Sequence, residues 1–466
     1  MFIPKRQWLL LALTYFITIA VNSQPRKTAT TEQEILKIYE AQLKSVYQAR
    51  GMSDNEIEKY LAGGKEGTAT LTDFSFELRQ LYSYTMAPKL AVLFYLFNKD
   101  TLYRYFITPG AILEKKKIAI KKAVLEKLNI DVYNSLDIYR QSTSRAPRIR
   151  GLKPTVKKPP GGISFEEAIQ KATSILLPES FDERYEHLIV IPAFSIGAFP
   201  FQLLQPYKDS SYLIDKCSFS IAPSLLDLVA IRKRMINKLK ETSGVNLVEY
   251  EKIPFTLEKP LFISNPSYPV TNKYFFPDLP GAKKEIAGNI PFAKEYTLLE
   301  GKNATKANVL NKIRHADVAY FATHGMSSDI NPLDNNLLVL AGEKDPFLTA
   351  RNIMSLRDTN YTDQYSFPKL IVLSACQTGL GKSMEAGITA GLARSFLVAG
   401  ANQVIMSLWN VDDNATAYLM NRFIFHLQNN NSYCPSEPLR LAQLETRKKF
   451  KHPSQWASFS VFGVNY

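Results

Sequence analysis

The sequence reads VAYFATHG over residues 318–325 and LIVLSACQTG over residues 370–379. Each stretch is a short run of apolar and β-branched residues that ends in a small or glycine-rich turn, a pattern typical of a strand buried on both faces of a parallel sheet. The first run leads into His324 and the second into Cys376. Because ligands and chemistry gather where the strands of an open α/β sheet end, the two runs indicate the fold and the place of a functional site together.

Cys376 and His324 have the side chains of a nucleophile and its base. A cysteine attacks as the thiolate, and a neighbouring imidazole lets it do so near neutral pH. Ala375 before the cysteine is small, and Gly325 after the histidine lets a substrate carbonyl approach the backbone. The pattern favours a cysteine peptidase. The alternative is structural, with Cys376 as a buried apolar residue and His324 as a hydrogen-bonding residue of the core.

Strand and helix patterns alternate from about residue 185 onward. Apolar runs at 188–192, 219–221, 261–265 and 403–408 predict strands, and helical spacing predicts helices between them. Such alternation builds a parallel sheet with helices on both faces. We therefore predict an α/β fold with a mostly parallel sheet.

A small α+β region is predicted before this domain, over residues 24–143. Apolar residues recur every four positions within 31–50, which predicts a helix. Runs at 90–97 and 102–108 predict a β-hairpin, and helical spacing returns over 118–139. We place the main domain at residues 163–466.

Residues 1–23 have the pattern of a signal peptide. Lys5 and Arg6 precede an apolar stretch at 8–21, which is shorter than the roughly 20 residues that span a bilayer. We expect cleavage near Ser23 and export to the periplasm or the medium; an uncleaved anchor or a short buried helix is the alternative. The remaining sequence holds no stretch apolar and long enough to be a membrane span.

Residues 144–162 form a basic, proline-rich linker. They include six Lys or Arg residues and four prolines, a composition that favours an exposed and extended chain. Three roles are open for this linker: a cleavage site that activates the protein, a tract that binds a surface, or a solvated loop.

Composition excludes several classes of partner. The net charge is +14, but Lys and Arg are spread along the chain without a nucleic-acid-binding motif, so we expect no nucleic-acid partner. The five histidines lack metal-ligand spacing, and the stretch CQTGLGKS at 376–383 lacks the first glycine of a P-loop, so we expect neither a metal nor a cofactor. Three cysteines form no disulfide framework, and whether Cys217 and Cys434 pair is open.

The motifs resemble those of the CHAT domain, a caspase-like peptidase domain of clan CD. The family's hallmarks are one strand that ends in A-T-H-G and another that ends in L-S-A-C-x-T-G, and this sequence has ATHG at 322–325 and LSACQTG at 373–379. The likeness continues in PFQLL at 200–204, GLAR at 391–394 and SLWNVDD at 407–413.

The resemblance implies a caspase-hemoglobinase-like fold in which Cys376 is the nucleophile and His324 the general acid/base. The backbone N–H groups of Gly325 and Cys376 would form the oxyanion hole, and a peptide bond would be hydrolysed through an acyl-enzyme. The partner it implies is a protein or peptide substrate, with a regulatory protein as a second kind of partner.

Asp412 and Asp413 follow the last apolar strand and are candidates for the substrate pocket, where two carboxylates would favour Arg or Lys before the scissile bond. The alternative is that they cap the next helix. Asp329 and Asp334, after the histidine motif, are further candidates.

Two other functions stay open at this point. One is a catalytically silent CHAT-fold module that binds proteins through the same cleft. The other is a zymogen that requires cleavage in the 144–162 linker, or a partner, before it acts.

Overall fold

The structure is a computed structural model, and it describes residues 26–48, 51–65, 67–136, 148–149, 163–242, 246–250, 255–271, 274–328, 331–357, 367–375, 391–409, 412–429 and 434–464. The predicted signal peptide, the candidate nucleophile Cys376, Asp329 and most of the predicted linker lie outside the described residues.

The described residues contain an eleven-stranded mixed sheet in the order β3-β2-β1-β5-β6-β16-β15-β14-β10-β7-β9. Its strands are β1 (Leu90–Asn98), β2 (Thr101–Thr108), β3 (Ala111–Ala119), β5 (His187–Ile191), β6 (Ser218–Ile221), β7 (Leu261–Pro266), β9 (Thr297–Gly301), β10 (Val318–Ala322), β14 (Leu370–Leu373), β15 (Gln403–Ser407) and β16 (Phe459–Gly463). One parallel block runs from β15 to β9, and β16 is antiparallel to β15 and parallel to β6. The predicted α/β fold with a mostly parallel sheet is confirmed.

The strands at the centre of this sheet are buried along their whole length, as their continuous apolar runs predict. Every residue of β10 and of β14 is buried. Helices cover both faces of a parallel sheet, so a strand there needs apolar side chains on both sides.

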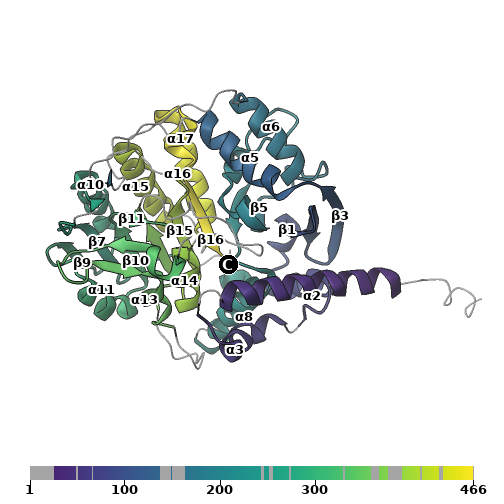
Figure 1. Cartoon of the computed structure of the whole chain (residues 1–466), viewed down its shortest axis with the longest axis horizontal. Coiled ribbons are helices and arrows are strands. Elements are labelled where there is room, and N and C mark those ends of the chain that lie inside the picture. The colour runs from purple at the N-terminus through teal and green to yellow at the C-terminus, as the bar shows by residue number, and fades with distance from the viewer. Residues whose placement is uncertain are drawn as a thin grey trace, which may run out of the picture.

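Helices pack on both faces of the sheet (Figure 1). On one face lie α10 (Pro280–Asn289), α15 (Asp413–Asn429) and α16 (Ser436–Lys449). On the other lie α8 (Leu225–Thr242) and α14 (Gly391–Ala399). All nine residues of α14 are buried; most are apolar, and the polar Arg394 and Ser395 are buried with them.

The N-terminal region follows its predicted pattern in part. Its helices are α2 (Arg26–Gln48), α3 (Asp54–Lys65), α4 (Leu71–Leu81) and α5 (Lys122–Ser135). The predicted first helix and the β1–β2 hairpin are confirmed, and the hairpin turns at Lys99 and Asp100, which both have positive φ. The helix predicted over 118–139 begins later, because β3 continues to Ala119.

The N-terminal region and the main domain share one sheet. β1 pairs in parallel with β5, with Val92 opposite Ile189, and one continuous cluster of buried apolar side chains includes residues from both parts. The division of the chain at residues 144–162 therefore stays a prediction from sequence composition, while in space the two parts form a common core.

Candidate active site

His324 lies at the carboxyl end of β10, beside the strand that leads to Cys376. β10 and β14 are parallel neighbours, with Phe321 opposite Leu373, and the Ser374 N–H donates to the Phe321 carbonyl at 2.9 Å. His324 follows Phe321 by three residues, and Cys376 follows Leu373 by three. Ala375 is the last described residue before the cysteine. The described strands thus bring His324 and Ala375, the residue before Cys376, to the same end of the sheet; the pairing of His324 with Cys376 stays a prediction.

The His324 side chain is fully buried and its ring is fixed. Its Nε2 lies 2.8 Å from the carbonyl oxygen of Pro277. The ring packs against Tyr268 and Phe276, with centroids 4.6 and 5.6 Å away. A carbonyl only accepts hydrogen bonds, so Nε2 carries the hydrogen and Nδ1 is the basic nitrogen of the neutral ring.

Asn265 holds the segment that carries Pro277. Asn265 ends the apolar part of β7 with a φ of 40°, its Nδ2 donates to Asp278 Oδ1 at 2.7 Å, and its Oδ1 accepts the Leu279 N–H at 2.9 Å. These bonds fix the two residues that follow Pro277. Because the Pro277 carbonyl sets the histidine tautomer, Asn265 acts on the site through the backbone.

The backbone on the other side of His324 is also fixed. Gly325 begins the short strand β11 (Gly325–Met326), which pairs antiparallel with β12 (Leu337–Val339). The Val339 N–H donates to the His324 carbonyl at 2.9 Å. The role of the Gly325 N–H in an oxyanion hole stays a prediction.

Asp412 caps a helix at the same edge of the sheet. Its Oδ1 accepts the N–H groups of Asn414 and Ala415, each at 3.0 Å, at the start of α15. This is the capping role that the sequence left open beside substrate binding. The cap uses one of the two carboxylate oxygens and leaves the other for a second contact. The substrate-binding role of Asp412 therefore stays a prediction.

Asp413 and Asp334 have contacts of their own. A Cβ atom added to Gly281 would lie 2.8 Å from Asp413 Cγ, so the Asp413 side chain lies directly against α10. Asp334 forms a two-point ion pair with Arg351, at 2.7 and 3.0 Å, and this pair lowers the pKa of its carboxyl group. Asp334 is therefore already neutralised by a neighbour.

The other two cysteines do not share the chemistry predicted for Cys376. Cys217 and Cys434 are both buried, and no disulfide joins them. Burial raises the pKa of the Cys217 thiol far above its ordinary value and that of Cys434 to about 11. A thiol with such a pKa is protonated near neutral pH and is a poor nucleophile.

Neither a metal centre nor a membrane span emerges from the described parts of the chain. They contain no group of three or more His, Cys, Asp or Glu side chains that could hold a metal ion. None of their helices combines the length and the apolar character that crossing a bilayer requires.

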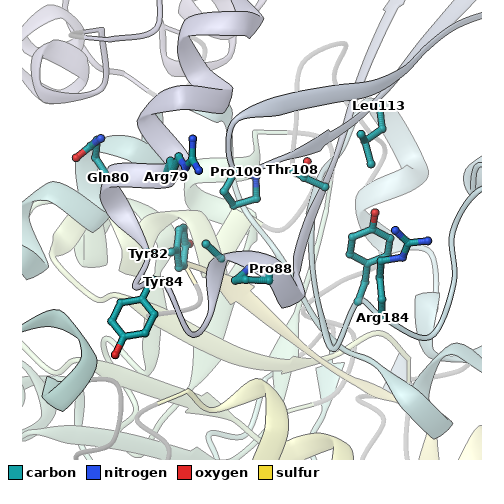
Figure 2. A pocket seen from close by; sticks show the side chains of 11 residues that line it. Arg79, Gln80, Tyr82, Tyr84, Pro88, Thr108, Pro109, Leu113 and Arg184 are labelled. Atoms are coloured by element: carbon teal, nitrogen blue, oxygen red, sulfur yellow. The ribbon is translucent and has the colours of Figure 1, made fainter.

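A cavity of about 780 Å³ lies far from His324 (Figure 2). It is lined by residues from the end of α4, the β2–β3 turn and the segment before β5, including Tyr82, Pro109 and Arg184. β2 and β10 are separated by six strands in the sheet order. This cavity therefore plays no part in the chemistry predicted at the ends of β10 and β14.

The chain belongs to the CHAT domain family, whose family model matches residues 166–464. Among curated proteins, it is similar to tetratricopeptide repeat protein 28 of Mus musculus, with 25% identity over 354 residues, and of Homo sapiens, with 25% identity over 368 residues. The alignments cover 70% and 71% of this chain but 14% of each relative.

Among solved structures, the chain resembles separase in the Saccharomyces cerevisiae separase–securin complex. The TM-score is 0.50 and the sequence identity 10%, over 88% of this chain and 33% of the other. This likeness concerns the fold, a mixed sheet flanked by helices of the caspase-like kind.

Proposed function

We propose that the chain is a cysteine endopeptidase of the CHAT type, with Cys376 as nucleophile and His324 as general acid/base. The observation that carries the proposal is the fixed, buried imidazole of His324 at the end of β10, next to the strand that leads into Cys376. Membership in the CHAT domain family and the caspase-like fold support it.

In the proposed reaction, Nδ1 of His324 takes the thiol proton and the Cys376 sulfur attacks the scissile carbonyl carbon. The Gly325 and Cys376 N–H groups stabilise the resulting oxyanion. The carbon–nitrogen bond then breaks, His324 returns the proton to the leaving amine, and a water molecule hydrolyses the thioester with His324 as base. The Pro277 carbonyl stabilises the imidazolium that forms on the way, because it accepts the hydrogen on Nε2.

We further propose that the substrates carry Arg or Lys before the scissile bond, on the ground that Asp412 and Asp413 lie at the start of α15, directly beyond the end of β15. Export, with cleavage near Ser23, is also part of the proposal and is supported by the sequence of residues 1–23.

The test compares the wild type with Cys376→Ala and His324→Ala on a pooled peptide library, with cleavage sites read by mass spectrometry. We expect cleavage by the wild type alone, and retained cleavage in the matched control Cys434→Ala, whose thiol is buried. Asp412→Asn and Asp413→Asn should each weaken the preference for a basic residue. Folded wild type that cleaves nothing, before and after nicking of the 144–162 linker, would contradict a peptidase that acts without a partner and would favour a silent binding module or a zymogen that needs a partner.

A further inference from the structure

The described part of the predicted linker pairs with the strand that leads to the contacts of His324. Its residues Arg148 and Ile149 form β4 (Arg148–Ile149), which pairs antiparallel with β8 (Tyr274–Phe275). In this pairing Arg148 lies opposite Phe275, and Ile149 lies opposite Tyr274. Antiparallel addition of an extended chain to a strand edge is a common mode of peptide recognition.

The strand β8 leads directly into the contacts of His324. The next residue, Phe276, packs against the imidazole, and the one after it, Pro277, accepts the Nε2 hydrogen bond. The partly buried Tyr274 packs against Phe276 with tilted rings whose centroids lie 6.0 Å apart. A chain that pairs with β8 is thus attached to the segment that orients the catalytic histidine.

The occupant of β8 shares features with the substrate proposed above. The linker sequence has Arg145, Arg148 and Arg150 within six residues, and its described part is extended as β4. An extended basic chain is also the kind of substrate proposed above.

We propose that the β8 edge is a peptide-binding edge beside His324, and that β4 occupies it as a tethered competitor of basic substrates. The inference rests on the proposed function and adds regulation to it. A ladder of two residues on each strand is short, so an incoming peptide or a cut in the linker can displace it. A tethered segment acts at an effective concentration on the order of millimolar, which is enough to compete with free peptide.

Docking is tested first, without any need for activity. In a Cys376→Ala background, the double variant Arg148→Cys/Phe275→Cys places two thiols on residues that lie opposite each other in the β4–β8 pairing. Directly opposed residues of antiparallel strands have Cα separations of roughly 4.5–5.5 Å, which a disulfide can bridge. We expect a disulfide, detected by mass spectrometry after digestion. The matched control Arg148→Cys/Val270→Cys uses an exposed position before β8 and should form little. Equal crosslinking in both variants would overturn the docking.

Competition is tested by kinetics on a basic peptide, with Cys376 intact. Arg148→Pro/Ile149→Pro removes both N–H groups of β4, and Thr155→Pro/Val156→Pro is the matched control in the same linker. We expect KM to fall roughly threefold to tenfold in the first variant, with kcat little changed, and no change in the control. An unchanged KM in the first variant would overturn the competition while leaving the peptidase intact. Absence of Cys376-dependent cleavage in every variant would overturn the proposed function and the competition with it, whereas the crosslink would still report docking.

Discussion

At the scale of residues, a buried ionic cluster joins the N-terminal helices to the helix that follows the candidate nucleophile segment. Asp227 of α8 is fully buried. Its two carboxylate oxygens lie 2.7 and 2.8 Å from the Tyr47 hydroxyl, which donates its hydrogen to the carboxylate, and Ser224 Oγ donates at 2.6 Å. The guanidinium of Arg394, on α14, lies 4.0 Å from Asp227 and donates to the Pro223 carbonyl. Burial raises the pKa of the Tyr47 hydroxyl, and the negative charge of Asp227 raises it further.

Removing the charge of Asp227 should destabilise the fold strongly. Asp227→Asn keeps the side-chain volume but leaves the buried Arg394 guanidinium without its carboxylate, and breaking a buried pair in this way costs about 3–5 kcal/mol. Urea unfolding, monitored by near-UV circular dichroism, measures the change in the free energy of unfolding. The matched control is Asp54→Asn, which breaks the exposed pair with Lys44 and should leave the midpoint nearly unchanged. Similar midpoints for the two variants would contradict this role of Asp227.

At this scale the sequence predicts functional side chains but not the backbone groups that hydrogen-bond to them. His324 was predictable because it closes an apolar run, and the structure places it at the end of β10. Its partner is the carbonyl of Pro277, which lies 47 residues away and carries no signal of its own. Asn265 could not be predicted either, since its bonds to Asp278 and Leu279 depend on how the chain folds back.

At the scale of elements, α3 is joined to a distant part of the chain by one carboxylate. Glu56 accepts the Ser53 N–H at 2.9 Å, which caps the helix, and it also pairs with Arg357. The Ser53 backbone hydrogen bond, followed by the Arg357 bond, lowers the pKa of Glu56 from its ordinary 4.5 to about 2.

The stabilisation from Glu56 should depend on pH in one direction. Its folded pKa lies below the unfolded value, so the contribution is fully present above pH 4.5 and is lost as the pH falls toward 2. We expect Glu56→Gln to lower the free energy of unfolding by roughly 1–2 kcal/mol at pH 7, after allowance for partial exposure, and by much less near pH 2.5. Urea unfolding at several pH values checks this, with Glu58→Gln, an exposed neighbour on α3, as the control. A difference that does not shrink with acid would contradict the assignment.

Elements were predictable from the sequence where the pattern was strong. Continuous apolar runs identified β5, β10 and β14, and the Ser164–Glu167 pattern belongs to a capping box that opens α6 (Phe165–Leu176). β3 was not predicted from the sequence, because its exposed lysines obscure the alternation of apolar and polar residues that is typical of an edge strand. The antiparallel direction of β16 also could not be read from its apolar sequence, since direction depends on its neighbours β15 and β6.

At the scale of the whole molecule, the family match begins at residue 166, but the sheet begins with β1–β3. β1 is almost entirely buried and covers the edge of β5 along five residue pairs. Tyr39 and Tyr47 of α2 reach the start of α8, where they hydrogen-bond Leu225 and Asp227. The region before the linker therefore completes the core of the matched domain.

A chain that begins at residue 163 should therefore fail to fold on its own, even though it contains the whole family match. Without β1, the apolar strand β5 becomes an exposed edge that invites aggregation, and without Tyr47 the buried Asp227 loses a hydroxyl hydrogen-bond donor. We expect this chain to lack near-UV circular dichroism and cooperative unfolding, while the control chain from residue 24 shows both. Adding residues 24–143 as a separate polypeptide should restore part of the signal, because the missing strands and helices supply the surface that β5 and α8 need. A monomeric, cooperatively unfolding chain from residue 163 would show that β1–β3 are an addition to the fold and not a part of its core.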